Sequence, residues 1–106
     1  MAKYLFRASL SQTGVQGTLK EGGGARRAAI ERLIQSVGGT LEAFYYAFGE
    51  DDIYIVADCP DHISTAAISM AIAASGLARI TTTVLLTPEE MDQVVKKKVI
   101  YRLPRA

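Results

Sequence analysis

TLEAFYYAFGEDDIYIVAD, residues 40–58, predicts a β-hairpin. Residues 40–48 and 53–58 are rich in the β-branched and aromatic residues that strands favour, and the link at 49–52 has the composition of a turn. A link this short predicts that the two strands pair directly. Alternation along the first strand places Leu41 and Tyr45 on one face and Phe44, Tyr46 and Phe48 on the other. A sheet covered by helices on one side only would therefore leave the second aromatic set exposed, as at an interface.

The residues before the hairpin predict one strand and one helix. Residues 3–9 alternate with a period of two and carry aromatic residues, which is typical of a half-buried strand. The Ser, Gln, Thr and Gly residues at 9–17 are interpreted as a loop or a loosely wound turn, and the glycines at 22–24 interrupt any helix that begins near Val15. The clearest helix follows these glycines, with apolar residues at helical spacing from Ala29 to Val37, and Gly38-Gly39 ends it.

The residues after the hairpin predict a helix, a strand and a second helix. An alanine-rich helix begins at Pro60-Asp61 and ends at Gly76, with Asp58, Asp61 or Ser64 as its N-cap. Residues 78–86 are a strand rich in Thr, Val and Leu. Thr87-Pro88-Glu89-Glu90 is a capping box with proline at the first helical position, and it starts a helix that runs to about Lys97. Residues 98–106 are expected to be an extended tail.

The element order is therefore βαββαβ with an added C-terminal helix. This order predicts an α+β, ferredoxin-like sandwich in one domain covering residues 1–106. Helices would cover one face of the sheet, and a partner subunit would close the other.

Composition narrows the function classes. The chain has 106 residues and a formal net charge of +1, so it has no strong positive potential that would attract nucleic acid or an anionic membrane surface. Its single cysteine, Cys59, excludes an internal disulfide framework. We find no signal peptide and no stretch of the roughly 20 apolar residues that span a bilayer. The expectation is a soluble cytoplasmic protein that gains stability by forming homo-oligomers.

Several blocks of the sequence resemble one family in order along nearly the whole chain. They are EGGGARR at 21–27, GGTLEAFYYAFGE at 38–50, DCPD at 58–61, TPEEM at 87–91 and YRLP at 101–104. These blocks are similar to the GYD-domain family of small, mostly bacterial proteins. The family arrangement of glycine, a variable residue, tyrosine and aspartate occurs here as Gly49, Glu50, Asp51 and Asp52. Asp51 thus stands at the position of the family tyrosine, while Gly49 and Asp52 carry over.

The resemblance implies a fold rather than a reaction. It implies a ferredoxin-like, oligomerising domain similar in shape to the dimeric α/β-barrel proteins, and it implies no agreed activity.

Candidate catalytic residues are few. His62 and Asp52 are the weak acid–base candidates, and Arg26 is a third for the enzyme alternative, although a solvated residue at a helix start is the simpler interpretation of His62. Cys59 precedes a helix start, where a thiol can be activated, but a buried spectator thiol is the simpler interpretation. The acids and the histidine near Cys59 fit no zinc spacing, so we expect neither a metal nor a cofactor.

Candidate ligand-binding residues are an arginine and three tyrosines. Gly22-Gly23-Gly24-Ala25-Arg26-Arg27 is similar to an anion-binding turn at a helix N-terminus, and the alternative is a flexible break before a basic helix face. Tyr45 and Tyr46 must face opposite sides of their strand, so one can line a cavity while the other faces a partner subunit. We predict a ligand site among Tyr45, Tyr46, Arg26 and Tyr54, with packing as the alternative role.

The charges separate along the chain. Acids gather at Glu50, Asp51, Asp52, Asp58 and Asp61, and bases gather at Lys96, Lys97, Lys98, Arg102 and Arg105. The simple interpretation is two solvated regions. The alternative is that the basic tail of one subunit docks near the acidic hairpin of another. The lysine run lacks the aromatic motifs of RNA-binding proteins, so nucleic acid is not an expected partner.

Three functions are consistent with these residues. The first is a homo-oligomeric domain that binds or senses a small molecule without catalysis. The second is a cofactor-independent enzyme similar to the monooxygenases and isomerases of the dimeric α/β-barrel type. The third is a purely structural oligomer. Fold alone does not decide among them.

Overall fold

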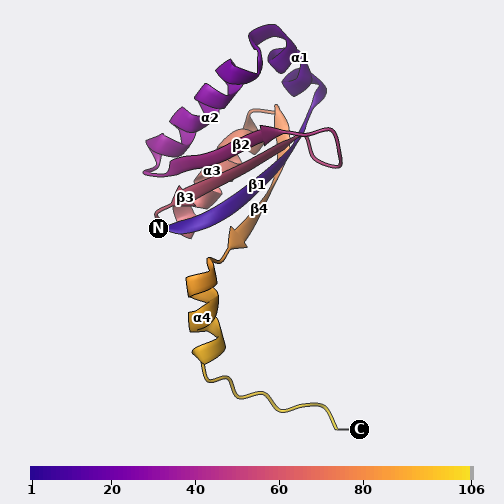
Figure 1. The fold of residues 1–106 in the computed structure, drawn as a ribbon. Helices are drawn as coiled ribbons and strands as arrows, with labels where there is room; N and C mark the ends of the chain where they lie inside the picture. Colours follow the sequence, from indigo (N-terminus) through magenta and orange to yellow (C-terminus); the bar gives the residue numbers. More distant parts are fainter. Residues whose placement is uncertain (106) are drawn as a thin grey trace.

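The computed structural model describes residues 1–105 as one antiparallel sheet with four helices (Figure 1). The elements in chain order are β1 (Ala2–Leu10), α1 (Gln12–Glu21), α2 (Gly23–Ser36), β2 (Thr40–Tyr46), β3 (Ile53–Cys59), α3 (His62–Ala74), β4 (Ala78–Leu85) and α4 (Pro88–Lys96). The prediction of a mixed α+β fold is confirmed.

The four strands lie in the order β2-β3-β1-β4, and each neighbouring pair is antiparallel. The first strand is therefore central, and it pairs along most of its length with both β3 and β4. The predicted hairpin of residues 40–58 is confirmed as the β2–β3 pair, although β2 ends two residues earlier than expected, at Tyr46.

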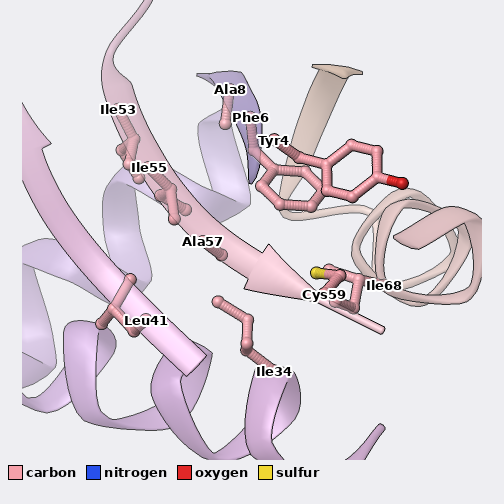
Figure 2. Close-up of a cluster of buried hydrophobic side chains, with 10 residues drawn as sticks. All are labelled: Tyr4, Phe6, Ala8, Ile34, Leu41, Ile53, Ile55, Ala57, Cys59 and Ile68. Carbon is pink, nitrogen blue, oxygen red and sulfur yellow. The ribbon is translucent and has the colours of Figure 1, made fainter. Parts of the chain in front are cut away.

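The core lies between the sheet and the helices. Every second residue of β3 and of the middle of β1 is buried, including Phe6 and Ile55, and these side chains meet Ile34 of α2 and Ile68 of α3 (Figure 2). Both helices thus cover the same face of the sheet, because their apolar residues pack on one set of alternating strand positions. The intervening residues of the strands form an opposite face, which no helix covers.

The alternation predicted for β2 is wrong at its start. A register shift between Leu41 and Ala43 places Leu41 opposite Ala57, on the same face as Phe44 and Tyr46. A bulge adds one residue to a strand, and this reverses the face of every residue beyond it. Phe44 consequently packs against the core beneath the helices instead of lying on the uncovered face.

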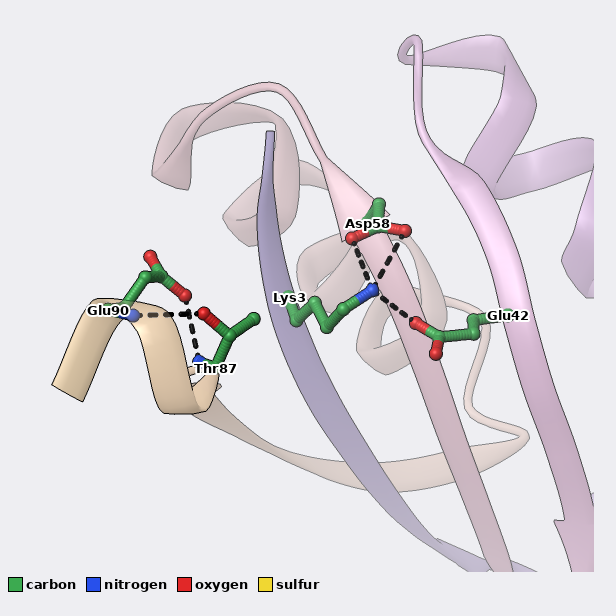
Figure 3. Close-up of polar contacts among 5 residues, drawn as sticks. All are labelled: Lys3, Glu42, Asp58, Thr87 and Glu90. Atoms are coloured by element: carbon green, nitrogen blue, oxygen red, sulfur yellow. Dashed lines mark hydrogen bonds and ion pairs between the residues drawn. The ribbon is translucent and has the colours of Figure 1, made fainter. Parts of the chain in front are cut away.

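The bulge also places a charged residue at the uncovered face. Glu42 lies within the irregular stretch, and its carboxylate accepts a hydrogen bond of 2.6 Å from the Lys3 ammonium (Figure 3). The same ammonium donates to Asp58 at 3.1 Å, so one cation links β1, β2 and β3. These hydrogen bonds raise the pKa of Lys3 above its ordinary value, and the bond to Glu42 has the larger effect.

The expected loop at residues 9–17 is wrong, because α1 occupies Gln12–Glu21. The Ser11 side chain caps this helix by accepting from the Gly14 N–H, while the Ser11 N–H donates to the Leu77 carbonyl at 2.9 Å. The predicted interruption by glycine is real, and it falls at Gly22, whose φ of +89° separates α1 from α2.

The two later helices begin as predicted. Asp61 is the N-cap of α3 and accepts from the Ser64 N–H at 2.7 Å. Thr87 and Glu90 form the reciprocal capping box of α4 (Figure 3). Helix α4 and the residues that follow it extend away from the sheet (Figure 1), and no residue of α4 is buried.

Candidate functional site

A cavity of about 280 Å³ lies between the helix-covered face of the sheet and three helices. Its floor comes from alternating residues of the strands, such as Ala8, Phe44 and Ile55, and its walls come from α1, α2 and α3. The lining residues are Ala8, Leu10, Gly14, Gly17, Thr18, Glu21, Arg26, Ala29, Ile30, Leu33, Phe44, Ile53, Ile55, Ala71, Ile72, Ser75, Leu77, Ala78 and Ile80. The lining is mainly apolar, with a few polar side chains, which is the usual composition of a small-molecule site.

Two charged side chains of this lining come from either side of the Gly22 break. Glu21 ends α1 and Arg26 lies in the first turn of α2, and their nearest nitrogen and oxygen atoms are 3.7 Å apart. The Arg26 side chain is 25% exposed, whereas that of Glu21 is 51% exposed. The guanidinium is therefore the more buried member of a loose ion pair.

Tyr46 lies beside Arg26 at the edge of the helix layer. Its hydroxyl donates to the Gly23 carbonyl at 3.0 Å, and a Cβ on Gly23 would lie 2.9 Å from the tyrosine ring. Burial raises the pKa of the Tyr46 hydroxyl, and the positive charge of Arg26 partly opposes that rise. Tyr46 thus fixes the start of α2 against β2, which also fixes the position of Arg26.

The structure separates the predicted ligand-binding residues into two pairs. Arg26 and Tyr46 lie on the helix side of the sheet, whereas Tyr45 and Tyr54 are directly opposite each other on the uncovered face. The Tyr45 ring is 70% exposed there. Among these four residues, only Arg26 contributes to the cavity lining. A ligand-binding role for the other three stays a prediction.

The second predicted arginine of the glycine-rich turn points elsewhere. Arg27 pairs with Glu31 one helical turn along α2, at 3.4 Å, and both side chains are exposed. The turn therefore presents one arginine to the cavity and one to solvent.

The weak acid–base candidates lie at opposite ends of β3, which are about 20 Å apart for a strand of this length. Asp52 precedes β3, and its carboxylate accepts from the Leu10 N–H at 2.7 Å. Its own N–H donates to the Ala8 carbonyl at 2.8 Å, so Asp52 fixes the hairpin loop to the end of β1. His62 starts α3 beside a shallow groove formed with Tyr4 and Thr82. Neither residue lines the cavity.

Asp51 has a distinct environment at the position of the family tyrosine. Its carboxylate accepts from the Ser9 hydroxyl at 3.1 Å and from the Arg7 guanidinium at 3.4 Å. Both partners belong to β1 and point to the uncovered face, because they alternate with the buried Ala8. This acid therefore ties the hairpin loop to that face.

Cys59 is fully buried in the core. Burial raises the pKa of its thiol, and a hydrogen bond with Thr65 partly opposes the rise. A buried thiol with a raised pKa is a poor nucleophile at neutral pH. Within residues 1–105, no three metal-binding side chains of His, Cys, Asp or Glu come together.

Sequence reasoning missed the part of the site that α1 supplies. Gly14, Gly17, Thr18 and Glu21 all line the cavity from this helix, whose first half was expected to be a loop or a loosely wound turn. The one signal for the start of this helix was Ser11, a residue type that favours the N-cap position. Serine is too common for an N-cap alone to identify a helix.

Comparison with known families shows that the model of the GYD domain matches residues 4–95. The chain belongs to the GYD domain family. The match contains most of β1, the other three strands, every wall of the cavity and nearly all of α4, and it stops before residues 96–105. Comparison with the curated proteins and with the solved structures gives no significant match. Among the described residues of this GYD domain, no helix has the length and apolarity needed to cross a membrane, and location in the cytoplasm stays a prediction.

Proposed function

We propose that this GYD domain is a homo-oligomeric protein that binds or senses a small molecule without catalysis, and that the ligand occupies the cavity beneath α1, α2 and α3. The observation that carries the proposal is the cavity itself. Its volume of about 280 Å³ is close to the lower end of the range of roughly 300–1,000 Å³ for small-molecule sites.

The placement of the titratable residues favours binding over catalysis. An acid–base mechanism needs a proton acceptor within hydrogen-bond distance of the substrate. The Asp52 carboxylate already accepts a hydrogen bond from the Leu10 N–H at the end of β1, and His62 lies beside a different groove. The cavity instead offers hydrocarbon surface with one ion pair among its polar groups. This arrangement supports retention of a ligand rather than its conversion.

The proposed architecture is ferredoxin-like, with the uncovered sheet face closed by a second copy as in dimeric α/β-barrel proteins. The strand order β2-β3-β1-β4 and the position of the helices on one face support this arrangement. The uncovered face carries both charged residues and the apolar or aromatic residues Leu5, Val56, Tyr45 and Tyr54. Covering such a mixed face with a copy of itself would bury apolar area that one chain leaves in water.

Native mass spectrometry of protein purified without tags or imidazole tests both parts of the proposal. We expect an oligomer that retains a stoichiometric additional mass. Ala29→Leu would extend a side chain into the cavity from α2, and we expect it to lose that mass. Ala25→Leu is the matched control, because Ala25 is an exposed residue of the same helix and does not line the cavity.

Other outcomes of this experiment point elsewhere. A clean oligomer with no retained mass in any of the three proteins would favour the purely structural oligomer. A clean monomer would contradict closure of the sheet by a second copy. Retention of the mass by Ala29→Leu would show that the ligand occupies another site.

The surface that forms the oligomer is tested by one further pair of variants. Val56→Asp places a carboxylate in the middle of the uncovered face, and in a symmetric interface it would face its own copy. We expect this variant to be monomeric in sedimentation velocity, whereas Gln35→Asp on the exposed side of α2 should remain oligomeric. An oligomeric Val56→Asp would place the interface elsewhere.

A further inference from the structure

We propose that the cavity selects a small apolar molecule with a single carboxylate, such as an arylalkanoate, and that Arg26 binds the carboxylate. The proposal rests on the function proposed above and specifies the chemical class of the ligand. It follows from two features of the cavity: its interior is hydrocarbon, and its lining contains one cation, Arg26.

The interior can hold only an apolar group. The strand floor and the walls from α2 and α3 contribute Ile, Leu, Phe and Ala side chains almost throughout. A polar group placed there would lose its hydrogen bonds to water without replacement, which costs several kcal/mol in a fully apolar environment. The ligand must therefore turn hydrocarbon toward the sheet.

The hydroxyl groups of the lining are already engaged. The Thr18 hydroxyl donates to the Gly14 carbonyl within α1, and the Ser75 hydroxyl donates to the Ile72 carbonyl at the end of α3. Each satisfies the backbone of its own helix, so neither donor is available to orient a ligand. Specificity for a polar group then falls to Glu21 and Arg26.

Arg26 has hydrogen-bonding capacity to spare. A guanidinium carries five N–H donors in a fixed planar arrangement that matches a carboxylate in a bidentate manner. Among residues 1–105, the Arg26 side chain makes no hydrogen bond, and its ion pair with Glu21 is long at 3.7 Å. A ligand carboxylate can therefore use these donors while its hydrocarbon lies in the cavity.

The relative burial of the ion pair favours an anion over a cation. Half of the Glu21 side chain is exposed at the last residue of α1, so it can turn to solvent when a second carboxylate approaches Arg26. A ligand ammonium would instead lie beside the more buried guanidinium, and the two positive charges would repel each other. A dianion would exceed the single positive charge that the cavity supplies.

The cavity volume bounds the size of the ligand. The volume of about 280 Å³ is nearly twice the roughly 150 Å³ of an engineered cavity that binds benzene. A phenyl ring with a short chain to a carboxylate fits this space, and 3-phenylpropanoate is a suitable probe.

Isothermal titration calorimetry with three probes of similar size tests the ligand class. The probes are 3-phenylpropanoate, the neutral 3-phenylpropanamide and the cationic 3-phenylpropylamine, each added to the full chain at pH 7. We expect the carboxylate to bind at least tenfold more tightly than the amide, and the amine to bind most weakly. Equal binding of the carboxylate and the amide would overturn the proposal while leaving a binding cavity. Tightest binding of the amine would overturn it in favour of recognition by Glu21.

Two neighbouring arginines provide the matched variants. Arg26→Gln should remove the preference for the carboxylate over the amide, and the binding of the amide that remains shows that the cavity is intact. Arg27→Gln should keep the full preference, because that side chain pairs with Glu31 on the exposed surface. An unchanged preference in Arg26→Gln would overturn the proposal. If none of the three probes bound the natural chain, the proposed ligand class would be overturned, and the ligand-binding function would be decided separately by the retained mass in native mass spectrometry.

Discussion

Gly39 lies at the buried junction between α2 and β2, where no side chain fits. A Cβ at this position would lie 2.7 Å from Cγ2 of Ile34 and 2.9 Å from the Asp58 carbonyl oxygen. Ile34 itself is fully buried, so it has no open space into which to move. We predict that Gly39→Ala lowers the free energy of unfolding by about 1–3 kcal/mol, the usual range for overpacking a core. Urea unfolding followed by circular dichroism measures this change.

The control for this prediction is another alanine substitution. A Cβ on Gly17 of α1 would meet no atom within 4 Å. Because alanine is the better helix former, Gly17→Ala should stabilise the fold by up to about 1 kcal/mol. Equal stability of the two variants would contradict the steric argument.

Cys59 should be unreactive in the folded protein. Its thiol is fully buried and burial raises its pKa, so little thiolate is present and little of it is accessible. We predict that iodoacetamide modifies the native protein far more slowly than the urea-unfolded protein, with the extent of labelling read by mass spectrometry. Labelling at similar rates would contradict the burial of this residue.

The same thiol makes the free energy of unfolding depend on pH in the alkaline range. A raised pKa means that the folded state keeps its proton at pH values where the unfolded chain has lost it, so the unfolded state gains stability there. The contribution of Cys59 is fully present below the pKa of the unfolded thiol, about 8.5, and is lost as the pH rises through the folded value. Comparing the pH dependence of unfolding in Cys59→Ala with that of the natural chain isolates this contribution from the tyrosines and lysines.

At the scale of elements, α4 is the helix most dependent on local interactions. It contains nine residues, none of them buried, and helices shorter than about 12 residues are marginal in water on their own. Its stability therefore depends on the Thr87–Glu90 capping box, the proline at its start and Lys96 in its last turn.

We predict that Thr87→Val melts α4 without weakening the sheet domain. Valine keeps the shape of threonine but cannot accept the hydrogen bond from the Glu90 N–H. Backbone NMR chemical shifts of residues 88–96 should move toward random-coil values, while the midpoint of urea unfolding stays the same. A lower midpoint would show instead that α4 is packed against the folded domain or a second copy.

At the scale of the whole molecule, the shape is that of a compact body with an arm. The radius of gyration is 17.0 Å, compared with about 13 Å for a compact domain of 100 residues. Figure 1 shows the reason, since α4 and residues 97–105 project away from the sheet. The arm exposes apolar residues, among them Val95, Ile100 and Leu103. Docking of this arm on a second copy stays a prediction.

Salt should weaken the oligomer if the arm docks by charge. The arm carries Lys96, Lys97, Lys98, Arg102 and Arg105, and the hairpin loop of another copy offers the exposed Glu50. Attraction between exposed charges is screened over about 10 Å at 0.1 M salt. We predict that the dissociation constant of the oligomer, measured by sedimentation equilibrium, rises between 0.05 and 0.5 M NaCl.

Charge variants separate this effect from general screening. Replacing Lys96, Lys97 and Lys98 by glutamine should flatten the salt dependence, whereas replacing Lys20 and Arg32 on the exposed sides of α1 and α2 should leave it unchanged. An oligomer indifferent to salt would exclude docking of the tail by charge, although not closure of the sheet face through its apolar residues.

The elements of this fold were largely predictable because their signals are local. Alternation in β1 and β3, the apolar spacing of α2, the Asp61 cap of α3 and the capping box of α4 each depend on residues within a few positions of one another. Arg26 was chosen from its place after the glycine-rich turn, and it does line the cavity, although its role in binding stays a prediction. Such patterns establish the type of each element before any tertiary contact forms.

Tertiary contacts decided what the sequence left open. Helix α1 contains two glycines, which disfavour a helix. It forms because Gly14 packs closely on the Leu77 carbonyl, where a Cβ would lie 2.0 Å from the oxygen. The bulge after Leu41 depends on pairing with β3, so alternation within β2 could not show which face its aromatic residues take. The cavity needs four strands and three helices at once. Local sequence thus determined most of the elements, whereas close packing between residues distant in the chain determined α1, the bulge in β2 and where the elements enclose a site, because such contacts leave no periodic trace in the sequence.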